Sequence, residues 1–317
     1  EVFADRGGSV ADVLLVVWKD AISAFTGDIV NATPVDRATL TGPVLAGLAW
    51  AIIFILPVCT AAVLIVVREP PRALRETVPI KEGLRYLWRN GPMRRVVMIG
   101  LLVVSGEAFR NAVSLFFIRD IIGVPTIGAA YFFYFIAGLA AIPFWLWLGR
   151  NIGKHRAFMC TLITVAVVSF ANLFLGYGDY LPFFLLFIVK GFCFGGLQFL
   201  PVAMLADVVD VDTARSGGRR AGTYFAIMGL TEKLAVAIGT GLSLNIVGLL
   251  GFDPAGGIEA STEIGVLSLR LVYCMGPIVF YGLAMGLIWS YPLTPVRHAR
   301  LRERIERRNA RLSSKLD

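Results

Sequence analysis

The sequence predicts an all-α polytopic membrane protein with about seven transmembrane helices. Of its 317 residues, 57% are apolar and 16% are charged, and its mean hydropathy is +0.73. An average soluble domain carries about 25% charged residues, so this chain has more apolar surface than a water-soluble core can hold. Its charges cluster in short segments between long apolar runs, which is typical of membrane-protein loops. This clustering argues against nucleic-acid binding, despite a net charge of +8.

Seven apolar runs are long enough to cross a hydrocarbon core, which needs about 20 apolar residues. We expect spans near residues 43–67, 96–118, 127–148, 157–177, 182–205, 222–250 and 267–290. Charged residues interrupt the apolar stretch before the first span, so residues 1–42 are expected to form an extracytoplasmic loop with an interfacial amphipathic helix. In the fifth span, Gly191, Gly195 and Gly196 predict the close approach of a neighbouring helix.

The distribution of lysine and arginine predicts the orientation. Most of these 30 residues lie in alternate segments, which the positive-inside rule assigns to the cytoplasm. We therefore expect a cytoplasmic central loop over 68–95, a six-helix bundle over 96–291 and a basic cytoplasmic tail over 292–317. The tail is interpreted either as a solvated basic helix or as a helix lying on anionic lipid.

The sequence contains no enzyme signature. It has no HExxH, no GxSxG and no glycine-rich phosphate loop, so we do not expect an enzyme. The four cysteines lie in apolar runs without CxxC spacing, which argues against a disulfide framework or a metal site. The two histidines, His155 and His298, lie in basic segments where solvation explains them.

Five ionisable residues lie inside the predicted spans: Glu107, Arg110, Lys190, Glu232 and Lys233. A charge at mid-bilayer costs several kcal/mol, so it normally faces a partner or a cavity. The spacing of the second span places four polar residues on one helix face: Glu107, Arg110, Asn111 and Ser114. An ion pair closed on itself would explain only the first two, so we interpret this stripe as a cavity-lining face.

The lysines of the later spans leave alternatives open. Lys233 lies about 11 residues into its span, roughly 16 Å along the axis, close to the bilayer midplane. It either faces a cavity or forms a structural ion pair, for which Glu232 is a candidate partner. Lys190 is nearer the end of its span and either snorkels outward or has a functional role. The remaining spans carry no charge and are expected to pack against lipid or neutral neighbours.

Residues 206–233, with the sequence ADVVDVDTARSGGRRAGTYFAIMGLTEK, carry a family resemblance. They resemble the stretch joining helices ten and eleven in the glycoside–pentoside–hexuronide:cation symporters, the melibiose-permease branch of the major facilitator superfamily. The segments IKEGLRYLWRNGPMRR and YPLTPVRHARLRERI resemble the same family, and the resemblance covers roughly 68–317. It implies that the spans correspond to helices 6–12 of that fold and that the N-terminal half of the transporter is missing.

The resemblance implies a transporter of the bacterial inner membrane that moves a sugar or glycoside with Na⁺ or H⁺ by alternating access. No cofactor beyond the coupling cation is expected. Lys233 matches a lysine beside the cation site, while Asp207, Asp210 and Arg219 match a charged loop that closes the cytoplasmic side. Ordinary positive-inside topology is a simpler explanation of that loop. Rocking needs two bundles, so we do not expect this chain alone to transport.

Two other functions fit part of the pattern. A lipid or lysolipid carrier of the same fold would favour a cavity with few hydrogen-bonding groups, against which the polar stripe of the second span argues. A seven-span receptor or retinal protein fits the helix count, although Lys233 lies on the sixth span rather than the last.

Overall fold

The computed structural model describes residues 37–66, 91–124, 127–216 and 221–289, which contain helices and no named β-strand. The chain divides into two compact units, 1–77 and 78–317. Helix α2 (Arg37–Val66) belongs to the first unit. The predicted interfacial helix, the gate residue Arg219 and the basic tail lie outside the described residues.

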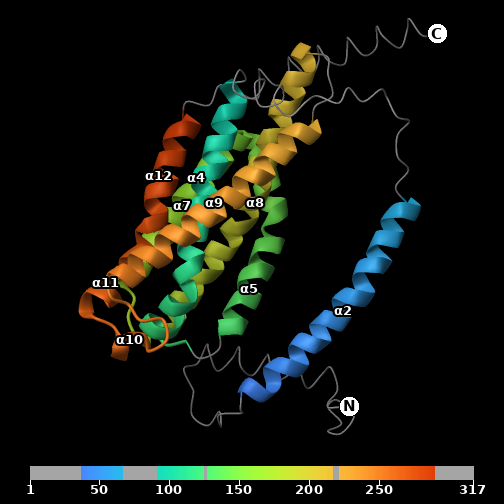
Figure 1. Ribbon diagram of the computed structural model, residues 1–317. Helices are drawn as coiled ribbons and strands as arrows, with labels where there is room; N and C mark the ends of the chain where they lie inside the picture. Colours follow the sequence, from blue (N-terminus) through green and yellow to red (C-terminus); the bar gives the residue numbers. More distant parts are fainter. Residues whose placement is uncertain (1–36, 67–90, 125–126, 217–220, 290–317) are drawn as a thin grey trace, which may run out of the picture. The chain divides into compact units, whose positions relative to one another are not determined.

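The second unit is a bundle of helices that run side by side (Figure 1). Its elements are α4 (Gly91–Phe116), the π-helical turn η1 (Phe117–Ile122), α5 (Ile127–Ala140), α6 (Ile142–Ile152), α7 (Lys154–Ala171), the 3-10 turn η2 (Asn172–Phe174), α8 (Tyr180–Ser216), α9 (Ala221–Leu249), α10 (Gly257–Ala260), α11 (Glu263–Cys274) and α12 (Gly276–Trp289).

The described helices confirm an all-α membrane fold. Five of them are long and apolar enough to cross a membrane, or six when α5 and α6 count as one bent span. In α2, residues 52–66 form a further, shorter apolar helix with exposed side chains. The expected third span is therefore a broken helix, bent by 40° between Ala140 and Ile142. Pro143 is the second residue of α6, where its missing N–H removes a helical hydrogen bond at the break.

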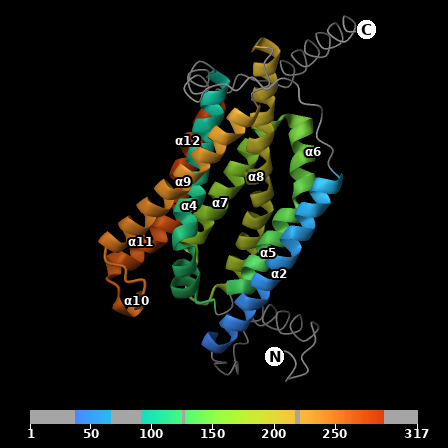
Figure 2. The same cartoon turned by 45° about the vertical axis from the view of Figure 1, so that its right-hand side comes forward.

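Helix α4 occupies the middle of the bundle, where it packs against α8, α9, α11 and α12. Figures 1 and 2 show α9 crossing α4 at an angle. The crossing is close because Gly239 of α9 lies against the backbone of α4, so a Cβ there would overlap the Ser105 carbonyl oxygen. This position brings α4 against these four helices, and its polar residues can reach several of them.

Helices α5 and α8 meet along a seam of glycines. A Cβ on Gly191 would overlap the Tyr134 backbone, and one on Gly195 would lie 2.7 Å from the Gly138 carbonyl oxygen. On the next position, a Cβ on Gly196 would lie 2.7 Å from Thr161 Oγ1 of α7. The close helix approach predicted from these glycines is confirmed, and it follows from the small residues that membrane helices use for packing.

Candidate functional site

Three of the charges in the spans meet between α4, α8 and α12. Lys190 Nζ donates a hydrogen bond to Glu107 Oε2 at 3.0 Å, and Arg110 Nη2 lies 3.8 Å from the same oxygen. The other carboxylate oxygen accepts a hydrogen bond from the Tyr281 hydroxyl. The Lys190 side chain is only 1% exposed, so it points into the bundle rather than snorkelling outward. We call Glu107, Arg110 and Lys190 the buried charge cluster.

Arg110 extends this cluster towards α11. Its Nη1 donates to the Tyr273 hydroxyl at 3.2 Å, and its Nη2 donates to Asn111 Oδ1 at 2.9 Å. The guanidinium carbon also lies 5.3 Å from the centroid of the Tyr273 ring, a cation–π distance. The planar fork of arginine allows these several contacts to be made at once. Its Nε is buried and has no hydrogen-bond partner among the described residues.

The predicted polar stripe of α4 therefore divides into an interior and a surface part. Arg110 and Ser114 are 4% and 1% exposed, whereas Asn111 is exposed. Ser114 Oγ donates to the Asn111 carbonyl at 2.9 Å and shares a hydrogen bond of 2.9 Å with the Tyr131 hydroxyl. Glu107 is shared among three helices, so its contacts extend well beyond the intrahelical pair with Arg110.

The buried charge cluster carries one carboxylate and two cations. Its formal charge is therefore positive, in a region where charges interact more strongly than in water. Lys190 Nζ also lies 5.7 Å from the centroid of the Tyr134 ring, whose face attracts a cation. Breaking a buried pair by removing one partner leaves an uncompensated charge, so the carboxylate of Glu107 is the group on which both cations depend.

Glu232 and Lys233 lie in a different environment, on the exposed side of α9. The buried residues of α9 form a stripe: Tyr224, Met228, Thr231, Ala235, Gly239, Ser243 and Val247. Lys233 is two residues from both Thr231 and Ala235, which places it about opposite the stripe. Neither charged residue has an ion pair with another described residue, and Glu232 does not pair with Lys233. We call these two residues the exposed pair of α9.

Of the predicted gate residues, Asp207 has a defined partner. Lys154 Nζ, at the start of α7, lies 2.6 Å from Asp207 Oδ1 and donates to the Ala203 carbonyl at 3.1 Å. Asp210 lies one turn further along α8 and is exposed. No sequence pattern pairs Lys154 with Asp207, because the two residues lie 53 residues apart in the chain.

Four tyrosines belong to the polar network although they were not predicted from the sequence. Tyr131, Tyr134, Tyr273 and Tyr281 all contact the polar network, and they come from two spans that were expected to face lipid or neutral neighbours. A buried tyrosine hydroxyl usually finds a hydrogen-bond partner. A hydroxyl in an otherwise apolar span is therefore the signal that could have identified them.

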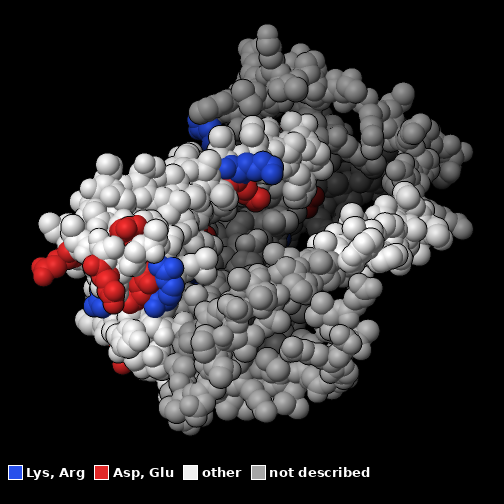
Figure 3. All heavy atoms as spheres, turned by 60° about the horizontal axis from the view of Figure 1, so that its bottom comes forward, with Lys and Arg blue, Asp and Glu red and all other residues white. Residues whose placement is uncertain are grey.

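Charged residues also gather at the end of the bundle where η1, α10 and α11 lie (Figure 3). There Arg119 forms two hydrogen bonds with Asp120, of 2.7 and 2.9 Å, and donates to the Pro254 carbonyl at 3.3 Å. Arg119 thereby links η1 to the loop that contains Pro254. The described residues contain no group of three or more side chains suited to hold a metal ion.

The chain is similar to proteins that are named as symporters or sugar transporters. The chain is 23% identical over 222 residues to the putative glycoside/cation symporter YagG of Escherichia coli, covering 69% of this chain and 47% of that protein. It is 23% identical over 248 residues to the isoprimeverose transporter of Lactiplantibacillus pentosus, covering 77% and 50%. With the uncharacterized symporter YjmB of Bacillus subtilis it shares 24% identity over 243 residues, covering 75% and 50%.

The chain thus spans about half the length of these relatives. The sequence pattern of a family described as MFS/sugar transport protein matches residues 9–295. This match confirms the predicted resemblance and extends it towards the N-terminus from residue 68. It covers most of the sequence and agrees with the apolar helical bundle. The apolar helices indicate an integral membrane protein, and the chain belongs to the MFS/sugar transport protein family.

Proposed function

We propose that this chain is the C-terminal part of a cation-coupled sugar symporter that works by alternating access. The observation that carries the proposal is the hydrogen bond from Arg110 to Asn111, which links the buried charge cluster to an exposed amide. The family and the names of the relatives support transport of a sugar or glycoside. The cluster holds Arg110, and through it the Asn111 amide, in a fixed position within an apolar bundle.

The geometry favours a ligand with hydroxyl or ether oxygens. Because Arg110 donates to Asn111 Oδ1, the amide nitrogen is left to donate two hydrogen bonds outward. Arg110 is itself held by Tyr273 and by Glu107, so the amide is preorganised. A sugar presents acceptors of this kind, and pre-ordering the donor reduces the cost of binding.

The exposed pair of α9 fits the coupling part of the proposal. A lysine near mid-membrane that forms no ion pair with a described residue of its bundle is costly unless it faces a cavity or another protein element. We expect an N-terminal half of the transporter to supply that partner and the ligands of Na⁺ or H⁺. Asp207, Asp210 and Arg219 would then close the cytoplasmic side by pairing across the two halves.

The direct test is uptake of a radiolabelled glycoside by membrane vesicles that contain the longest product of this gene. We expect accumulation above the external concentration when a Na⁺ or H⁺ gradient is imposed, and none when both gradients are dissipated. Accumulation that persists without either gradient would overturn cation coupling. Transport of lysolipid without transport of any glycoside would overturn the sugar assignment.

The role of Asn111 is tested in the same assay by Asn111→Ala. We expect KM for the transported sugar to rise about tenfold, since one well-placed hydrogen bond is lost. Asn245→Ala is the matched control, because Asn245 is an exposed amide on α9 that donates to the Gly241 carbonyl. Equal KM values for the two variants would remove Asn111 from the site and leave the transport proposal standing.

The variant Lys233→Met tests whether Lys233 acts in cation coupling rather than in folding. Because Lys233 has no ion pair within the described bundle, we expect the variant to reach the membrane in normal amount. Uptake driven by the cation gradient should fall at least tenfold, whereas exchange of internal for external sugar should continue. Unchanged gradient-driven uptake would exclude Lys233 from the mechanism.

A further inference from the structure

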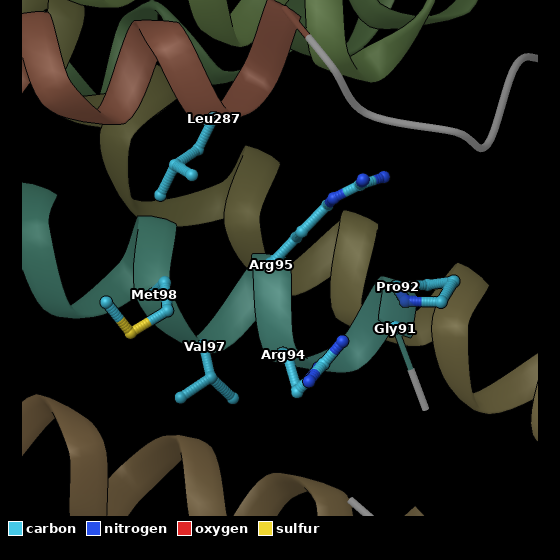
Figure 4. Close-up of a pocket in the computed structure, with 7 residues that line it drawn as sticks. All are labelled: Gly91, Pro92, Arg94, Arg95, Val97, Met98 and Leu287. Atoms are coloured by element: carbon cyan, nitrogen blue, oxygen red, sulfur yellow. The ribbon is translucent and has the colours of Figure 1, made fainter. Parts of the chain in front are cut away.

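A pocket of about 480 Å³ lies at the start of α4, beside the end of α12. The described residues that line it are Gly91, Pro92, Arg94, Arg95, Val97, Met98 and Leu287 (Figure 4). Leu287 reaches the pocket from α12, and the other lining residues come from the first turns of α4. The pocket is separate from the buried charge cluster, which lies further along α4.

The pocket has a basic end and an apolar end. Arg94 is exposed and Arg95 is half-buried, and neither has an ion pair with an acidic residue of the described ranges. Val97 and Met98 follow about one helical turn deeper, roughly 5 Å along the axis, and the Met98 side chain is 46% exposed. Two arginines at one end and apolar side chains at the other suit a ligand in which a phosphate is joined to an acyl chain.

The position of the pocket in the bundle agrees with this chemistry. The beginning of α4 and the ends of α6 and α12 lie at the same end of the bundle (Figures 1 and 2). Among described residues outside the bundle interior, this end carries Arg94, Arg95, Arg150, Lys154 and Arg156, and the other end carries Arg119 and Arg270. The positive-inside rule therefore assigns the pocket to the cytoplasmic leaflet, which is rich in anionic lipid.

We propose that this pocket binds an anionic phospholipid, with its phosphate on Arg94 and Arg95 and an acyl chain along Val97, Met98 and Leu287. Arginine pairs with phosphate through two parallel hydrogen bonds, and its methylene stem packs on the lipid chain. Zwitterionic lipid offers the same phosphate, but its attached cation opposes the two arginines. The bound lipid joins the start of α4 to the end of α12, independently of any transported substrate.

The test is native mass spectrometry of the purified chain in mild detergent, with phosphatidylglycerol or phosphatidylcholine added at equal concentration. We expect one phosphatidylglycerol to be retained at least tenfold more strongly than phosphatidylcholine. Arg94→Gln/Arg95→Gln should lower that retention about tenfold or more, because basic residues near an anionic surface act roughly additively. The control Arg150→Gln/Arg156→Gln removes the same charge at the same end and should change retention less than twofold.

Two further measurements identify the bound chemistry. Arg94→Lys/Arg95→Lys keeps the charge and should restore most of the retention, which separates binding from misfolding. Inorganic phosphate and glycerophosphoglycerol, which lack acyl chains, should not displace the lipid at equal concentration. Displacement by either would overturn a lipid site in favour of a simple phosphate site. Equal losses in both arginine double variants, or equal retention of the two lipids, would also overturn the proposal.

Discussion

The charged residues of the membrane spans form two sets with opposite surroundings. The buried charge cluster consists of Glu107, Arg110 and Lys190, which contact one another between helices of one bundle. The exposed pair, Glu232 and Lys233, lies on the side of α9 away from its buried stripe. Each set combines carboxylate and basic groups in an apolar segment. An apolar segment shows that a charge within it is costly. The helix face on which the charge lies determines whether residues of the same bundle or other surroundings offset that cost.

The largest expected difference comes from removing each carboxylate charge. Glu107→Gln leaves Arg110 and Lys190 buried without an anion, so we expect the free energy of unfolding to fall by about 3–5 kcal/mol. Glu232→Gln, at an exposed position, should change it by less than about 0.5 kcal/mol. Unfolding of both purified variants in mixed micelles by increasing SDS measures the two values. Equal losses would mean that the two sets do not differ in their structural role.

A glycine substitution extends the comparison from charge to packing. Gly191 follows Lys190 directly and lies against the Tyr134 backbone, so Gly191→Ala forces α8 away from α5 and moves Lys190 with it. We expect a loss of about 1–3 kcal/mol in the free energy of unfolding. In Gly241→Ala on α9, the added methyl group meets no atom within 4 Å, so this control should be neutral or slightly stabilising. The same SDS titration applies, and an equal loss in the control would contradict the proposed seam.

The smallest expected effect concerns one hydroxyl group. Tyr281→Phe removes the hydrogen bond to Glu107 and keeps the ring, so we expect a loss of about 0.6 kcal/mol, and at most about 1.7 kcal/mol. Tyr177→Phe is the control, because the Tyr177 side chain is 78% exposed. A loss as large as that of Glu107→Gln would show that the hydroxyl, rather than Lys190, is the main partner of the carboxylate.

The fold class could be predicted because hydropathy and helix length are properties of single segments. The apolar runs predict the spans, and Gly191 and Gly195 predict the close approach of a neighbouring helix, which the structure shows to be α5. The break at Ala141 was not predicted, although Pro143 lies well inside the expected span 127–148, where a proline breaks or kinks a helix.

The candidate site could be predicted only in part, because its contacts join distant residues. The spacing along α4 identified Glu107, Arg110 and Asn111, which share one helix face. Lys190 lies 83 residues from Glu107, and Tyr281 lies 174 residues from it. No periodic pattern encodes such separations, so their meeting depends on how α8 and α12 pack against α4.

The same separations impose an order on biosynthesis. Glu107 enters the membrane with α4, but Lys190 is made 83 residues later and Tyr281 174 residues later. At about 5–20 residues per second, the carboxylate waits on the order of ten seconds for its lysine and longer for its tyrosine. Throughout that interval Arg110, three positions along the same helix, is the cation that its own segment provides. The intrahelical contact, weak at 3.8 Å in the finished bundle, is therefore the one that accompanies α4 through insertion.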